Sequence, residues 1–220
     1  MWSHGVKSCS KLVVGGNNMG KVYSFFGFSR ALIANRIKFS IRDFLVPSKV
    51  DYLIGQLVER SCSSQTFIGA GIARSCFDGG AQTCVVKVDK NYYVDIDDDH
   101  AEWEYYDTIF DDDFVDGGWQ LNDLKNAIKG KECYSCQNRD EVHTYEYFQK
   151  KKPELLSKIA IPYAVSSNYA VEVMEYCSHY DGEENAHEFL ELFNDAHDGN
   201  LGYNSFGKLV LLDYGMEEYA

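Results

Sequence analysis

Three polar side chains near the C-terminus have the types and the spacing of a site that binds a cation and moves a proton. Asp195, Asn200 and Asp213 follow the pattern Asp-x4-Asn-x12-Asp. The apolar run 209–212 leads directly into Asp213, so a hairpin would bring two carboxylates and an amide to one of its ends. Oxygen ligands of this kind suit a divalent cation, and a free carboxylate can act as a base. The spacing therefore indicates a cation site with room for a base.

A lysine and a glutamate upstream could serve an anionic ligand. Lys87 lies in the apolar run Cys84–Val88, where its ammonium needs a polar partner, and a phosphate plus a carboxylate would satisfy it. Glu141, on the first turn of a helix expected to begin near Asn138, could supply that carboxylate by packing over the lysine strand. The ordinary alternatives are a lysine that reaches solvent and a glutamate that stays solvated.

A pair of glycines precedes the lysine strand. Gly69 and Gly71 flank Ala70 between two β-prone runs. A glycine turn lets backbone N–H groups approach a phosphate closely, although an ordinary turn explains the same pattern. Further along, the segment 171–177 is typical of a strand that runs into a turn.

In chain order, these features resemble the signature set of the protein kinase-like superfamily. The segments that carry the resemblance are a glycine loop at 67–77, a lysine strand at 84–88, a glutamate helix at 138–141, a hinge strand at 173–177, a catalytic loop at 195–203 and a metal-binding triplet at 213–215. The Asp-x-His-x-Gly-Asn form of the catalytic loop is similar to small-molecule kinases of the aminoglycoside and choline type. It is also similar to short serine/threonine kinase-like proteins of bacteriophages.

The resemblance implies ATP and Mg²⁺ as cofactors and a role in phosphoryl transfer for each matched residue. Gly69 and Gly71 would cover the phosphates, and Lys87 would contact them. Glu141 would orient Lys87, and Asp195 would accept the proton of the attacking hydroxyl.

The remaining matched residues would hold the metal ion and the base of the nucleotide. Asn200 and Asp213 would bind Mg²⁺. The hinge residues Met174, Glu175 and Cys177 would present backbone groups to adenine.

The chain also departs from the family pattern. Lys87 and Glu141 lie 54 positions apart, farther than in the family, so the segment 90–136 would be an insertion. Glu104 is the alternative partner for Lys87, at the more usual distance. Only seven residues follow Asp213, so most of the helical lobe would be missing. Either the helices expected within 20–60 replace that lobe, or phosphorylation of a substrate has been lost.

Helices and short antiparallel strands must position these side chains. Helical spacing of apolar residues over 20–60, broken at Pro47, predicts two or three helices. The other expected elements are three consecutive antiparallel strands within 66–88, a helix at 138–151, a hairpin of 159–165 with 169–176, a short helix at 186–193 and a strand pair around 205–207.

Together these expectations give an α+β fold. It would be a protein kinase-like fold with an antiparallel β N-lobe, N-terminal helices and a strongly reduced C-lobe. An N-terminal helical segment, 1–65, would precede a kinase-like core, 66–220, which contains the acidic insertion 90–136.

Charge is concentrated in one part of the chain. The net charge is −13, and the segment from Asp95 to Asp116 contains eleven acidic residues and no Lys or Arg. The other residues, 23 acidic and 21 basic, are nearly balanced. Such a segment repels nucleic acid phosphates, so we expect no nucleic acid partner. It is either a solvated surface or a binding surface for a basic partner.

Composition indicates a folded protein of one domain, or one domain with a small appendage. Hydrophobic residues make up 45% of the 220 residues, which is typical of a globular chain. The apolar runs are shorter than the roughly 18–20 residues that span a bilayer, so no membrane partner is expected. The first ten residues lack the apolar stretch of a secretory signal, which favours the cytoplasm, or the host cytoplasm for a phage protein. Seven scattered cysteines, an odd number, favour reduced thiols.

Two functions from different classes remain open. The first is a Mg·ATP-dependent protein kinase that phosphorylates Ser, Thr or Tyr of host proteins or of itself. The second is a kinase-fold inhibitor or decoy that binds a basic host protein through the acidic insertion. The sequence leaves the oligomeric state and the substrate open.

Overall fold

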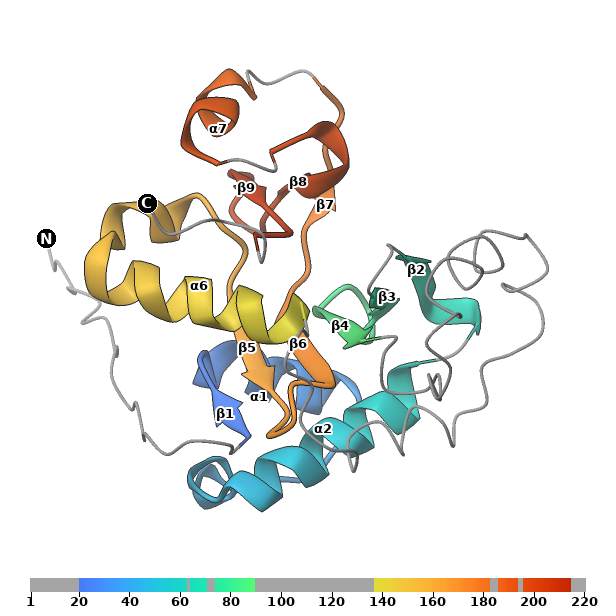
Figure 1. Cartoon of the computed structure of the whole chain (residues 1–220). Helices are drawn as coiled ribbons and strands as arrows, with labels where there is room; N and C mark the ends of the chain where they lie inside the picture. Colours follow the sequence, from blue (N-terminus) through green and yellow to red (C-terminus); the bar gives the residue numbers. More distant parts are fainter. Residues whose placement is uncertain are drawn as a thin grey trace, which may run out of the picture.

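The computed structural model describes residues 20–62, 64–70, 74–89, 137–182, 186–193 and 196–214. Within these residues the protein is α+β and contains a six-stranded and a three-stranded antiparallel sheet (Figure 1). The larger sheet has the order β1-β5-β6-β4-β3-β2. Its strands are β1 (Lys21–Val22), β2 (Phe67–Ala70), β3 (Arg74–Asp78), β4 (Cys84–Asp89), β5 (Pro162–Val165) and β6 (Val171–Glu175).

The three consecutive strands expected before the acidic segment are confirmed as β2, β3 and β4. The turn between β3 and β4 forms because the Asp78 carboxylate accepts hydrogen bonds from the backbone N–H of Gly80 (2.9 Å) and of Gln82 (3.0 Å). Gly80 has a φ of +104°, a conformation that glycine adopts without strain. Gly69, expected in a loop, instead lies inside β2 opposite Cys76.

Two helices cover one face of the larger sheet. Helix α1 (Phe25–Ala34) begins at Ser24, whose Oγ accepts a hydrogen bond from the backbone N–H of Gly27. A 3-10 helix, η1 (Ile41–Leu45), leads to α2 (Pro47–Ser61), so Pro47 begins the second helix. The buried side chains of α1 and α2 form one hydrophobic core with alternate residues of β4 and β6, among them Phe28, Leu32, Ile54, Leu57, Val86, Val88, Val171 and Val173.

A third helix lies on the opposite face of the sheet. Helix α6 (Gln137–Lys151) ends just before Pro153, as expected, and a short 3-10 helix, η4 (Pro153–Ser157), follows it. The predicted hairpin after it is confirmed as β5 and β6. The polar residues of the central strands share this face, because Lys87 is the register partner of both Cys76 and Glu172. The larger sheet therefore has an apolar side under α1 and α2 and a charged side under α6.

A second hydrophobic core lies between α6 and the C-terminal elements and includes Phe148, Phe189, Leu201 and Tyr214. The C-terminal elements are β7 (Ser178–His179), α7 (His187–Leu192), the 3-10 helix η5 (Asp198–Asn200), β8 (Leu201–Tyr203) and β9 (Leu209–Leu211). Figure 1 shows them above α6, whereas α1 and α2 lie below it. Leu211 joins this part to the chain before β5, because its backbone bonds with Lys158 (2.8 Å) and Ala160 (2.9 Å).

The buried residues of α1 and α2 pack with the larger sheet and not in the core that contains Phe189, Leu201 and Tyr214. The two N-terminal helices therefore share one hydrophobic core with β4 and β6. No helix among the described residues is long and apolar enough to cross a membrane.

Gly27 tests the close packing of α1 on β5. A Cβ at this position would collide with the ring of Tyr163. Although alanine favours a helix, we expect Gly27→Ala to lower the free energy of unfolding by about 1–3 kcal/mol. Gly69→Ala is the matched control, because a Cβ there would meet nothing within 4 Å. Urea denaturation measures both, and equal stability of the two variants would contradict this packing.

Candidate functional site

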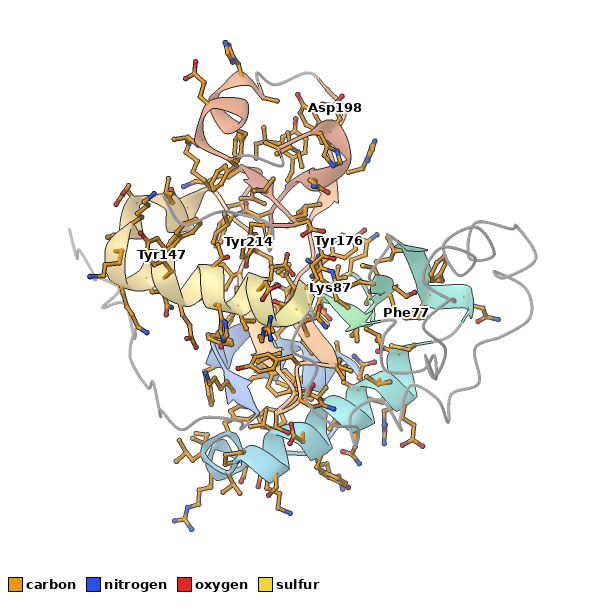
Figure 2. All side chains as sticks on the ribbon, viewed as in Figure 1. Phe77, Lys87, Tyr147, Tyr176, Asp198 and Tyr214 are labelled. Carbon is orange, nitrogen blue, oxygen red and sulfur yellow. The ribbon has the colours of Figure 1, made fainter. Side chains whose placement is uncertain are left out.

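Lys87 lies next to α6 (Figure 2) and belongs to a cluster of buried charged side chains on that side of the sheet. Its ammonium nitrogen, Nζ, lies 2.8 Å from Oε1 and 3.0 Å from Oε2 of Glu141. The same Nζ donates to the backbone carbonyl of Leu212 at 2.8 Å. The predicted contact between Lys87 and Glu141 is therefore present, and it joins β4 to α6 and to the segment after β9. Glu104, the alternative partner, lies outside the described residues.

Arg74, at the start of β3, is the second cation of the cluster. Its guanidinium contacts the carboxylate of Glu141, and its Nη2 lies 2.7 Å from Oδ2 of Asp213. It also donates to Oδ1 of Asn138 at 3.3 Å. Burial disfavours the charged form of Arg74, but the carboxylates of Glu141 and Asp213 outweigh burial and raise its pKa above the ordinary value. A buried guanidinium needs such partners, since an unpaired one would be strongly destabilising.

Asp213 follows β9, and its carboxylate bonds to two other elements. Nε2 of Gln137, the first residue of α6, donates to Oδ1 at 2.8 Å and to Oδ2 at 2.9 Å. Arg74 takes a further position on Oδ2. The side chain of Asp213 is still 25% exposed. The three expected parts, the lysine strand, the glutamate helix and the C-terminal aspartate, thus meet at one place.

Glu172 places a second carboxyl group in the cluster, opposite Lys87 on β6. Among the described residues, no donor lies within hydrogen-bond distance of either Glu172 oxygen, and Arg74 Nη1 lies 3.8 Å from Oε2. Burial raises the pKa of Glu172 well above its ordinary value, and the neighbouring carboxylate of Glu141 raises it further. A protonated Glu172 can donate a hydrogen bond to the carboxylate of Glu141. Burial and the charge of Glu141 therefore both favour the neutral form of Glu172.

Glu141 is the charged member of this carboxyl pair. Burial alone would raise its pKa, but the charges of Arg74 and Lys87 outweigh burial and lower the pKa to about 2. The backbone N–H of Tyr214 also donates to Oε1 at 3.4 Å. Two cations, Arg74 and Lys87, thus face two carboxylates, Glu141 and Asp213.

Of the two residues predicted to bind Mg²⁺, Asp213 has its carboxylate bonded to protein side chains in this arrangement. Three hydrogen-bond or ion-pair contacts from Arg74 and Gln137 already use both oxygens of Asp213. Asn200 ends η5, and its backbone carbonyl accepts a bond from the N–H of Leu212 at 2.7 Å. No cluster of three or more His, Cys, Asp or Glu side chains suited to a metal ion occurs in the described part of the chain.

The remaining residues proposed from the sequence lie in several places. Gly71 and Asp195 fall outside the described residues, as does the acidic insertion. Met174 and Glu175 lie inside β6, where Met174 pairs with β4 and the Glu175 N–H donates to Ile161. Cys177 follows the strand, and burial raises the pKa of its thiol to about 12. Cys177 is therefore the one hinge residue of the three that lies beyond the end of β6.

Three residues of the charge cluster escaped the sequence analysis: Arg74, Gln137 and Glu172. Glu172 stands in an apolar strand just as Lys87 does, so the same reasoning about a buried charge could have found it. Arg74 lay within the segment assigned to the glycine loop, where its charge was not considered. Gln137 carried no sequence signal, because its role follows only from the approach of α6 to β9.

Comparisons with known proteins found no family model, curated protein or solved structure that matches this chain. The function therefore has to be argued from the geometry of the charge cluster.

Replacing Glu172 or Glu141 with glutamine should change the stability of the fold in opposite directions. The unfolded chain ionises Glu172 near its ordinary pKa of 4.5, whereas the folded protein keeps it neutral at higher pH. Glu172 therefore stabilises the fold fully below pH 4.5, and this contribution is lost as the pH rises toward the raised pKa of the folded state. We expect Glu172→Gln to gain stability over the parent by up to about 1.4 kcal/mol per pH unit in this range.

Glu141→Gln is the matched comparison. Glu141 has a lowered pKa, so its contribution is present above pH 4.5 and is lost as the pH falls toward 2. At pH 7 Glu141→Gln removes the negative charge that Arg74 and Lys87 both contact. We expect this to lower the free energy of unfolding by about 3 kcal/mol or more. Urea denaturation between pH 5 and 8 measures both variants. If Glu172→Gln were as destabilising as Glu141→Gln, Glu172 would not be the neutral group.

Proposed function

We propose that this protein is a kinase-like, ATP-dependent phosphotransferase. The observation that carries the proposal is the position of Lys87, which contacts Glu141 on α6 and the carbonyl of Leu212, directly before Asp213. In phosphoryl transfer of the kinase type, a strand lysine contacts the phosphates of ATP and a helix glutamate orients that lysine. The pair is buried and joins two segments 54 residues apart, which an incidental surface contact would not do.

The order of the elements around the pair also supports the proposal. A glycine-containing strand, a lysine strand, a glutamate helix, a hinge strand and a terminal aspartate follow one another in the chain as β2, β4, α6, β6 and Asp213. All except β2 contribute a residue to the same cluster, and β2 pairs with β3, which carries Arg74. Residues that matched the motif by chance would not be expected to lie together in one cluster.

The proposed reaction transfers the γ-phosphoryl group to a hydroxyl oxygen. That oxygen forms a bond to the γ-phosphorus, the bond from the γ-phosphorus to the bridging oxygen breaks, and ADP leaves. Lys87 would neutralise phosphate charge, and the backbone beyond β6 near Cys177 would receive the adenine. The resemblance to kinases would give the proton of the hydroxyl to Asp195, and Mg²⁺ at Asn200 and Asp213 remains a prediction of the sequence. The substrate would be a Ser, Thr or Tyr side chain of a host protein or of this chain.

A second candidate is a kinase-fold protein that binds a basic host partner without transferring phosphate. The contacts of Asp213 with Arg74 and Gln137 favour it, because they occupy a carboxylate that an active enzyme needs for its cofactor. The acidic segment from Asp95 to Asp116 would supply the charge that recognises such a partner.

ATP should raise the melting temperature through Lys87. A ligand that binds only the folded state stabilises it by mass action, so millimolar ATP with Mg²⁺ should produce a shift that Lys87→Met abolishes. Lys38→Met, on an exposed residue of the N-terminal helical segment, should keep the shift. Differential scanning fluorimetry measures all three proteins, and no shift in the parent protein would contradict the nucleotide site.

Labelled ATP separates the candidate functions. Incubation with a cell lysate should transfer label from γ-labelled but not from α-labelled ATP, and Asp195→Ala should remove the transfer while ATP binding stays nearly unchanged. Transfer from α-labelled ATP would indicate nucleotidyl transfer. Binding without any transfer would favour the decoy, and full transfer by Asp195→Ala would show that Asp195 is not the base.

A further inference from the structure

Arg74 is a cation built into the candidate nucleotide site. The guanidinium of Arg74 is buried, with 4% of the residue exposed, and lies between the carboxylates of Glu141 and Asp213. These two carboxylates, on α6 and on the segment after β9, hold the guanidinium in position. A planar guanidinium can bond several acceptors at once, which a lysine ammonium does less well.

The contacts of Arg74 place positive charge where a kinase-type site would place a metal ion. Oδ2 of Asp213 lies 2.7 Å from Nη2 of Arg74 and 2.9 Å from Nε2 of Gln137. A magnesium ion bound to the same oxygen at its usual distance would lie within about 5 Å of the guanidinium, with strong repulsion between the two cations. Moving Arg74 away would leave a buried charge in need of new partners. The ion and the guanidinium therefore compete for one carboxylate.

The charges of the cluster already balance without a metal ion. Arg74 and Lys87 contribute two positive charges, and Glu141 and Asp213 contribute two negative ones. Glu172 lies beside them with no hydrogen-bond donor among the described residues, and burial favours the neutral form of its carboxyl group. Asp213 consequently presents no unpaired negative charge that a divalent cation would have to screen from the phosphates of a nucleotide.

We propose that Arg74 is the resident counter-cation of Asp213 and that this site therefore binds ATP without a divalent metal ion. The proposal rests on the nucleotide site proposed above. It adds a role for a residue of β3 and changes the cofactor requirement expected from the sequence. Arg74 acts here by positioning and neutralising Asp213 and is not assigned a part in bond breaking.

Isothermal titration of the full chain with ATP tests the proposal directly. One titration contains EDTA and the other contains excess Mg²⁺. We expect the two dissociation constants to agree within about threefold, because Arg74 supplies the charge in both. Binding that appears only with Mg²⁺ would overturn the role of Arg74 and leave the nucleotide site intact. Binding in neither buffer would overturn both the role of Arg74 and the proposed function.

The variant Arg74→Met tests whether Arg74 is the reason that ATP binds without a metal ion. Without the guanidinium, Asp213 repels phosphate in EDTA and becomes free to bind Mg²⁺, so we expect the affinity in EDTA to fall by about tenfold or more and Mg²⁺ to restore it. Arg139→Met is the matched control, because Arg139 also lies on α6 but, among the described residues, forms its ion pair with the neighbouring Asp140. Its binding should remain independent of Mg²⁺. An Arg74→Met protein that binds ATP equally well in EDTA would contradict the proposal.

A double variant keeps the test decisive if Arg74→Met fails to fold. Arg74→Met with Asp213→Asn removes both members of the ion pair, so no charge is left unpaired between them. Its nucleotide affinity should again be the same in EDTA and in Mg²⁺. If the double variant required Mg²⁺ for binding, the pairing of Arg74 with Asp213 would not explain metal-independent binding, and the proposal would be wrong.

Discussion

The carboxylate of Glu141, buried between Lys87 and Arg74, is the interaction on which the arrangement of this protein depends. Burying any one of these charges alone would cost several kcal/mol, so each requires the others to be in place. The three residues come from α6, β4 and β3, and Asp213 and the carbonyl of Leu212 add the segment after β9. The charge cluster thereby fixes the position of the C-terminal segment relative to the larger sheet.

A cluster of this kind needs a sheet with two different faces. Alternation along β4 directs Val86 and Val88 into the hydrophobic core under α1 and α2, and it directs Lys87 to the other side. A shift of register by one residue would bury Lys87 in the apolar core and expose the valines, which the free energy of burial strongly opposes. The apolar core beneath the sheet therefore stabilises the register on which the charged site depends.

The charges of the cluster are held by one another. Burial and the neighbouring carboxylate of Glu141 raise the pKa of Glu172, whereas Arg74 and Lys87 lower the pKa of Glu141. Arg74 also forms an ion pair with Asp213. The two cations therefore have carboxylate partners within the cluster itself.

Sequence patterns by themselves determined the local elements. Apolar periodicity and turn residues identified α2, α6, the three strands β2 to β4 and the hairpin of β5 with β6, because these signals act over a few neighbouring residues. The need of a buried lysine for a carboxylate left Glu141 and Glu104 as candidate partners of Lys87, and the structure shows the contact with Glu141. Only the tertiary structure decided that Arg74 and Gln137 bind Asp213 and that α1 and α2 cover the sheet. These contacts depend on how elements far apart in the chain approach one another, and no local pattern encodes that distance.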